Sequence, residues 1–359
     1  MTTYILRRIL LSIPVLIGIL FATFALGRLI PGDPCRAMLG EKATDIVCDE
    51  FNHRHGLDKP IPVQFGVYVG EILQGDFGRS FRFSKPITEL LMERLPITVE
   101  LSFAALMLAM LVGVPLGIIS AIRHNSWVDV GTMVCANVGV SMPVFWLGLM
   151  LAYIFALALK GTPFALPPSG RLSPGLLTTP FYETWGLTLE PTGVFYTILD
   201  FLGRMNILNA ILSANFKLLG DAVKHLILPA MALGTIPMAL IARMARSAML
   251  EVLGQDYIRT ARAKGLVERA VVVRHALKNA SLPLVTLIGL DIPFLLGGAI
   301  VTETVYSWPG MGRLFWQQAG RGDYPTVMAI LLIVATAVVL FQILTDIAYT
   351  LIDPRIRLS

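Results

Sequence analysis

The sequence predicts an all-α, polytopic integral membrane protein, and two observations support that fold class. First, 55% of the 359 residues are hydrophobic and only 15% are charged, whereas a soluble domain of this length carries about 25% charged residues. Second, the apolar residues gather into long runs, and about 20 consecutive apolar residues are enough to cross a bilayer as a helix. The mean hydropathy of +0.71 agrees with a chain whose natural solvent is lipid.

The apolar runs predict about six membrane-spanning helices. They cover residues 9–30, 99–122, 130–159, 226–245, 282–305 and 327–351. The first run is longer than the apolar region of a signal peptide, which has about 7 to 15 residues, and no A-x-A cleavage site follows it. We therefore expect it to remain in the protein as a helix.

Basic residues concentrate in one connection, between the fourth and fifth apolar runs. Residues 243–278 contain eight Lys or Arg and three Asp or Glu, so their charge of eight minus three equals the net charge of +5 of the whole chain. Lys and Arg near the ends of membrane helices mark the cytoplasmic side. This connection is therefore predicted to be cytoplasmic, which argues against nucleic acid as a partner. An even number of helices then places both termini in the cytoplasm, in agreement with Arg7, Arg8, Arg355 and Arg357.

This topology divides the chain into an N-terminal transmembrane helix (1–30), an exported loop region (31–96), a core of five transmembrane helices (97–352) and a cytoplasmic tail (353–359). Within the core we expect an exported loop at 160–225 and a cytoplasmic loop at 246–281. Residues 194–212 are fairly apolar, but their Asp, Arg and Asn side chains would be costly at mid-bilayer. An interfacial helix is the preferred interpretation there, and a further crossing is the alternative.

A short helix is predicted inside the basic connection, in the stretch DYIRTARAKGL that begins at Asp256. Asp256 suits the N-cap and Gly265 the position just past the C-terminus, which leaves about eight helical residues between them. A helix of that length is not stable alone in water, so we expect it to rest on a partner surface. Its small residues would permit close approach, and Arg259, Arg262 and Lys264 would pair with acids or lipid phosphates. The alternative is a loop that only sets orientation. The next stretch, 266–280, is predicted to be an amphipathic helix with an apolar stripe of Leu266, Ala270, Val273 and Leu277.

The whole stretch from EVLGQDYIRTARAKGL to SLPLVT (251–286) resembles the cytoplasmic signature loop of ABC-transporter permease subunits, specifically those of the dipeptide/oligopeptide permease family. Further motifs of that family follow in its order along nearly the whole chain: IPGDP (30–34), GLDKP (56–60), GDFGRS (75–80), SMPVFWLG (141–148), PPSGR (167–171), ETVYSWPGMGRL (303–314) and DPRIR (353–357). The resemblance implies the type I ABC importer permease fold.

In that family, a helix of this loop inserts into a groove of a cytoplasmic ATPase subunit and transmits ATP-driven closure to the membrane helices. Carried onto this chain, the resemblance implies a coupling helix formed by Asp256, Tyr257, Ile258, Arg259, Thr260, Ala261, Arg262, Ala263, Lys264 and Gly265. The more widespread permease motif has an acid and two alanines where this chain has Arg259, Thr260 and Ala261. The ATPase residues that would meet Arg259 therefore stay open.

The resemblance also implies an importer of di- and oligopeptides, whose pathway lies between this chain and a second homologous permease subunit. Two cytoplasmic ATP-binding subunits and an exported or periplasmic solute-binding protein would complete it in the bacterial inner membrane. No G-x-x-x-x-G-K-[ST] occurs here, so we expect no cofactor in this chain and ATP and Mg²⁺ in the partner subunits. The chain is thus expected to be a transport subunit and not an enzyme. Nickel complexes or other small solutes remain alternative substrates.

Asp291 lies well inside the fifth predicted helix, where a carboxylate is costly unless it faces a cavity or a partner. One interpretation places it on the translocation path, where it would attract the ammonium group of a passing peptide. The other pairs it with a base or a polar side chain of a neighbouring helix. In a secondary transporter driven by an ion gradient, which is the competing class, Asp291 would be the protonation site. Five acids near predicted helix ends are interpreted as anchors: Glu100, Asp129, Asp221, Glu303 and Asp346.

Cys35 and Cys48 fall in the first exported loop, where the compartment is oxidising if the topology holds. Either a disulfide or two free thiols fits the sequence. His53 and His55 form an H-x-H, but no carboxylate partner is assured, so we prefer solvated loop histidines to a metal site. The sequence contains no convincing set of nucleophile, base and orienting group.

Overall fold

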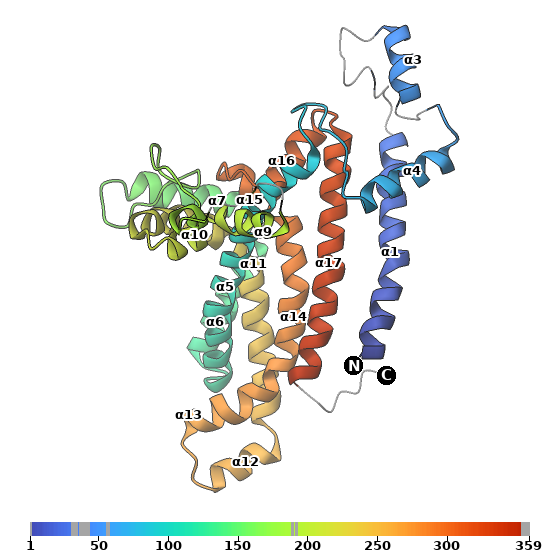
Figure 1. Ribbon diagram of the computed structural model, residues 1–359. Coiled ribbons are helices and arrows are strands. Elements are labelled where there is room, and N and C mark those ends of the chain that lie inside the picture. Colours follow the sequence, from blue (N-terminus) through green and yellow to red (C-terminus); the bar gives the residue numbers. More distant parts are fainter. Residues whose placement is uncertain are drawn as a thin grey trace.

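The computed structural model describes residues 2–29, 35, 44–54, 58–187, 190 and 193–352, and this part of the chain is a helical bundle without strands (Figure 1). Five of its helices are long and apolar enough to cross a membrane. They are α1 (Thr2–Leu29), α5 (Ile87–Ile122), α11 (Phe216–Leu253), α14 (Leu277–Gly298) and α17 (Tyr324–Ile352). The predicted tail at 353–359 lies outside the described residues. The all-α membrane fold class is confirmed.

The third predicted helix is not one helix. Residues 130–159 divide into α6 (Trp127–Ser141), α7 (Val144–Ala152) and the π-helix η2 (Tyr153–Ala158), and the chain bends by 104° between α6 and α7. Met142, with ψ of 129°, leaves the helical region because the ring of Pro143 clashes with a helical residue before it. The predicted count of about six spans therefore holds only when this bent pair is counted as one broken span.

One end of the bundle carries the basic segment, and we call it the α12 end. There α11 is followed by α12 (Asp256–Ala263), α13 (Glu268–Ala270) and the π-helix η3 (Val271–Ala276), which continues into α14. Figure 1 shows α1 beginning and α17 ending at this same end. Arg8 of α1 and Asp346 of α17 form an ion pair of 3.0 Å there.

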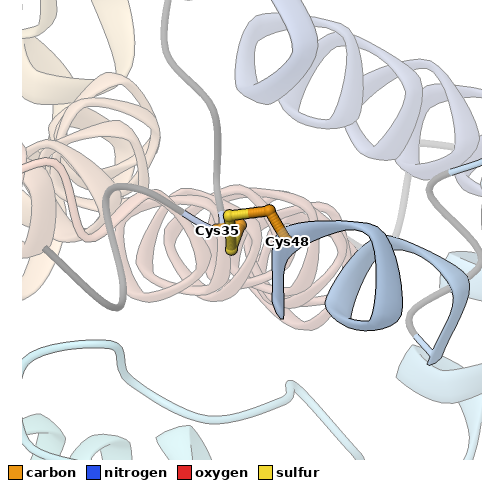
Figure 2. Close-up of a disulfide and its surroundings, with 2 residues drawn as sticks. All are labelled: Cys35 and Cys48. Atoms are coloured by element: carbon orange, nitrogen blue, oxygen red, sulfur yellow. A yellow bond between two sulfur atoms is a disulfide. The ribbon is translucent and has the colours of Figure 1, made fainter. Parts of the chain in front are cut away.

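The opposite end, which we call the α16 end, is built from short helices. They are α3 (Asp45–Arg54), α4 (Ile61–Leu73), α8 (Phe181–Thr184), α9 (Val194–Gly203), α10 (Asn206–Leu212), α15 (Ile300–Val305) and α16 (Met311–Ala319). The predicted interfacial segment 194–212 is thus two short helices, and neither is long enough to span a bilayer. A disulfide joins Cys35 to Cys48, which lies in α3 (Figure 2).

Two of the predicted loops contain more helix than expected. α5 begins at Ile87, inside the loop region predicted for 31–96, and α11 begins at Phe216, inside the loop predicted for 160–225. Both helices continue past their apolar runs into polar sequence. Hydropathy marks where a helix meets lipid and does not mark where its hydrogen bonding ends.

The centre of the bundle is the contact between α5 and α11, where glycines bring the two backbones together. A Cβ on Gly117 of α5 would lie 2.5 Å from the carbonyl oxygen of Ala242, and one on Gly234 of α11 would lie 2.7 Å from that of Ala105. Only glycine allows such an approach, as in other membrane helix pairs. The pair forms one side of an apolar cluster that also includes Leu295 of α14.

Candidate functional site

α12 packs onto the bundle through one face. Ile258 and Ala261, three residues apart and therefore on one side of the helix, have 0% and 7% exposure. They join an apolar cluster with Ala121 at the end of α5, Met249 near the end of α11 and Val271 of η3. The predicted need for a supporting surface is thus met in part within the chain itself.

Two polar contacts fix α12 to its neighbours. The Tyr257 hydroxyl accepts a hydrogen bond of 2.6 Å from the amide nitrogen Nδ2 of Asn279. The Arg262 guanidinium donates to both carboxylate oxygens of Glu268, at 2.7 and 3.1 Å. This fork raises the pKa of Arg262 above its usual range. Arg262 is therefore already paired inside the chain.

The opposite face of α12 points away from the bundle. The Arg259 side chain is 75% exposed, and its contact in the chain is a 3.5 Å approach to Asp256, whose own side chain is 96% exposed. Thr260, Ala263 and Lys264 are also exposed. An exposed ion pair of this kind contributes at most about 1 kcal/mol, so Arg259 can exchange it for another partner at little cost.

The ends of α12 differ in part from the prediction. Gln255 is the N-cap and makes no side-chain capping bond, while Asp256 is the first residue of the helix. Asp256 still suits this position, because a carboxylate in the first turn faces the positive end of the helix dipole. Gly265, with φ of +75°, ends the helix in the left-handed region as predicted.

The apolar stripe predicted for residues 266–280 is wrong in part, because, of its four members, only Leu277 packs against the cluster that holds α12. Leu266 and Val273 are 41% and 55% exposed, whereas Val271, Val272 and Ala276 are buried. Leu266 lies before α13 and outside any helix, and from Val271 the π-helix η3 changes which side chains face the bundle, because a π-helical turn holds more residues than an α-helical turn.

Asp291 is buried, with 7% exposure. It lies on the same face of α14 as Leu284, Ile288 and Leu295, which are seven, three and four residues away. These three side chains pack against α5 and α11. Within the described ranges, its Oδ2 atom has no hydrogen-bond partner and no ion pair includes it. The structure thus provides no support for the pairing interpretation within this chain.

The five acids interpreted as anchors all contact neighbouring segments. Glu100 pairs with Arg171 at 2.7 Å, and Glu303, fully buried, accepts from Thr98 at 2.7 Å. Asp221 accepts two hydrogen bonds from Ser173, Asp346 pairs with Arg8, and Asp129 pairs with Arg246. The sequence does not identify Arg171 and Arg246 as the partners of Glu100 and Asp129, because no local pattern marks a base whose acid lies far away in the sequence.

Only one of the two histidines of the H-x-H lies among the described residues. His53 lies exposed in α3, and His55 lies outside the described residues. Among the residues whose positions are described, no group of three His, Cys, Asp or Glu side chains is arranged to hold a metal ion.

Two family models match the chain. Residues 1–102 match the N-terminal part of the membrane components of binding-protein-dependent transport systems, and residues 113–358 match the binding-protein-dependent transport system inner membrane component itself. The class of the protein is therefore an inner membrane component of such a transport system.

The relatives narrow this class. A dipeptide transport system permease protein of Alkalihalophilus pseudofirmus is 45% identical, over 99% of this chain and 100% of its own. A di/tripeptide permease protein of Pseudomonas aeruginosa is also 45% identical, over 99% of each chain. An oligopeptide permease protein of Bacillus subtilis is 38% identical, over 99% of this chain and 100% of its own. The chain belongs to the dipeptide/oligopeptide permease family of ABC transporters.

A solved structure supports the fold. The MetNI methionine ABC transporter, in an inward facing conformation, has a chain with 18% sequence identity that aligns with a TM-score of 0.50. The alignment covers 75% of this chain and 99% of that one. The predicted type I ABC permease fold is confirmed.

Proposed function

We propose that this chain is one of two permease subunits of an ATP-driven importer of di- and oligopeptides, and that α12 couples it to an ATPase. The observation that carries the coupling role is the division of α12 into two faces. Ile258 and Ala261 anchor the helix to the ends of α5 and α11, and Arg259 is presented outward. A displacement of α12 caused by a partner on its outer face would be transmitted to the membrane helices through the contacts of its buried face.

The remaining partners follow from the class of the protein. A second homologous permease subunit would form the pathway together with this chain, and an exported solute-binding protein would deliver the substrate. Two cytoplasmic ATP-binding subunits would bind ATP and Mg²⁺, since the sequence has no phosphate-binding loop of its own. The α12 end, with both termini, would then face the cytoplasm.

Peptides are the proposed substrate because the relatives named above carry peptide transport in their names. Asp291 is the candidate contact on the path. A buried carboxylate without a partner in the described part of its own chain is costly, and the ammonium group of a peptide at the interface of the two permeases would offset that cost. Nickel complexes or other small solutes remain alternative cargo of the same machinery.

The cycle needs two conformations and no bond-making residue in this chain. Binding of ATP would draw the two ATPases together, α12 would carry that motion, and the permease pair would open outward to receive substrate. Hydrolysis and product release would reset the pair. ATP can bias the two conformations only through a differential contact, and the outer face of α12 would supply it.

A cross-link tests the coupling role in the assembled transporter. With exposed Cys135 replaced by serine, we expect Arg259→Cys, alkylated with a thiol-reactive benzophenone, to cross-link to an ATPase subunit on illumination. Ile258→Cys, on the buried face of the same helix, is the matched control and should give no product. Cross-linking of neither or of both positions would contradict the proposed face.

The competing function is transport driven by an ion gradient, with Asp291 as the protonation site. The two differ in energy source. Uptake into vesicles by the proposed importer should continue when the proton gradient is collapsed at constant ATP, and should stop when ATP is removed. The opposite pattern would support the secondary transporter.

A further inference from the structure

A buried ion pair at the α12 end joins α6 to α5 and α11, two helices that apolar packing already holds together. Asp129, in the first turn of α6, accepts hydrogen bonds from Nε and Nη2 of Arg246 on α11 at 2.6 and 2.7 Å. It also accepts one from the backbone N–H of Asn125 at 2.9 Å and one from the hydroxyl of Ser120 on α5. One carboxylate thus contacts α5, α6, α11 and the turn between α5 and α6.

This pair is built with little tolerance. Asp129 has 3% exposure and Ser120 has none, while the Arg246 side chain is 27% exposed. Two parallel bonds between a guanidinium and a carboxylate fix both distance and orientation. Removing one partner would leave the other charge buried and unpaired, so the three helix ends separate here only with difficulty.

The pair lies directly beside the surface on which α12 rests. Ala121, next to Ser120 on α5, and Ala248 and Met249, which follow Arg246 on α11, belong to the same apolar cluster as Ile258 of α12. Among the residues that the structure describes, this cluster contains none from α6. A displacement of α12 therefore reaches α5 and α11 through apolar contact, and Asp129 joins α6 to both of them in addition to the direct packing of α6 on α5 and α11.

We propose that Asp129 and Arg246 are positioning residues that make the α12 ends of α5, α6 and α11 one rigid unit. When α12 is displaced, the unit moves as a whole and carries α6 with it. The bend after Ser141, and not the α12 end, then accommodates any change of angle along the third span. This proposal rests on the coupling role of α12 proposed above.

The test measures a distance in the complete transporter, with both permeases, the ATPases and the binding protein, in lipid nanodiscs. Spin labels at Val134→Cys on α6 and Val267→Cys next to α12, both exposed positions, report their separation in the Cys135→Ser background. In the wild-type pair, we expect the same separation without nucleotide and with a non-hydrolysable ATP analogue. With Asp129→Asn, we expect the separation to change between the two states.

Transport gives the second readout. Asp129→Asn should lower the amount of peptide transported per ATP hydrolysed by about 5-fold or more, the lower end of usual coupling strengths, while the ATPases still co-purify. Arg246→Lys keeps the charge but loses the fork and should have a smaller effect in the same direction. The control is Asp200→Asn, which also breaks an acid–arginine pair, with Arg204 at 2.7 Å, but at the α16 end. It should change neither readout.

Two outcomes would overturn the proposal. If Asp129→Asn and Arg246→Lys leave the separation and the transport per ATP unchanged, the pair does not carry motion to α6. If both variants only reduce the yield of transporter, and the assembled remainder behaves as wild type, the pair is purely structural. Failure of the coupling role itself is distinguishable, because Arg259→Cys would then give no ATPase cross-link in the otherwise wild-type chain.

Discussion

At the scale of single residues, Asp291 is the side chain whose surroundings most need an explanation. It is buried on the face of α14 that packs against α5 and α11, and Oδ2 has no partner in the part of the chain that the structure describes. A structural role within the chain would require a donor, and no described residue supplies one. The translocation path is the place that we propose for its partner.

We expect Asp291→Asn to reduce uptake of peptides with a free amino terminus. Loss of one hydrogen bond to a charged group is worth about 1.5–3 kcal/mol, which corresponds to a reduction of about 10-fold or more. Uptake of an N-acetylated peptide, which lacks the ammonium group, should change much less, and Asp291→Glu should retain most of the activity. Equal uptake of the free peptide by wild type and Asp291→Asn, with unchanged ATPase stimulation, would contradict the path interpretation.

The arginines of α12 show how far residue roles can be predicted. Composition and charge located the basic helix, and the resemblance implied a coupling role for it, but Arg259 and Arg262 were equivalent at that level. The structure distinguishes them. The chain turns at Gly265, and this turn brings Glu268 into contact with Arg262 and not with Arg259. Such a pairing depends on the path of the chain after the helix, which no pattern within the helix encodes.

At the scale of elements, glycines bring the backbones of α5 and α11 into close approach. We expect Gly117→Ala to destabilise the protein, because the added Cβ would lie 2.5 Å from both the Ala242 carbonyl oxygen and the Ala245 Cβ. Overpacking of this kind costs about 1–3 kcal/mol. The measurement is the thermal unfolding midpoint of the purified transporter in detergent.

Gly131→Ala on α6 is the matched control. It is also a glycine inside a membrane helix, but nothing lies within 4 Å of its added Cβ. Since alanine favours helix over glycine by about 1 kcal/mol, this variant should be neutral or slightly more stable. Equal effects of the two substitutions would mean that the close approach of α5 and α11 does not contribute to stability.

The elements also show what periodicity misses. The apolar run of residues 130–159 is continuous in hydropathy, yet Pro143 divides it, because a proline removes a hydrogen bond and restricts the residue before it. The π-helix η3 likewise changes which side chains of 266–280 are buried. The proline that breaks the span is visible in the sequence, whereas a π-helical turn has no comparable local signal.

At the scale of the whole molecule, hydropathy predicted the spans and charge predicted which end differs from the other, because both are summed over many residues. The short helices of the α16 end were largely missed. The positions of these helices depend on contacts between segments that are distant in the sequence. Examples are the ion pair of Arg171 with Glu100 and the hydrogen bond from the Phe181 backbone N–H to Asn209. Loop sequences rich in Pro and Gly carry no helical period from which such an arrangement can be predicted.

The orientation of the molecule in the membrane can also be tested, because the two ends are expected on opposite sides of the membrane. The α12 end holds the basic residues and the proposed ATPase contact, and the α16 end holds the Cys35–Cys48 disulfide. In right-side-out membrane vesicles with Cys135→Ser, a membrane-impermeant thiol reagent should label Leu177→Cys, which is 88% exposed in the loop before α8.

Arg259→Cys should remain unlabelled in the same vesicles until the membrane is permeabilised. Both positions are highly exposed in the chain, so in vesicles that contain this chain without the ATPase subunits a difference between them reports the side of the membrane and not burial. Because Lys and Arg are retained on the cytoplasmic side and disulfides persist in oxidising compartments, one orientation satisfies both ends. Labelling of Arg259→Cys without permeabilisation would show the reverse orientation. It would also contradict the proposed contact of α12 with the ATPases, since their ATP is cytoplasmic.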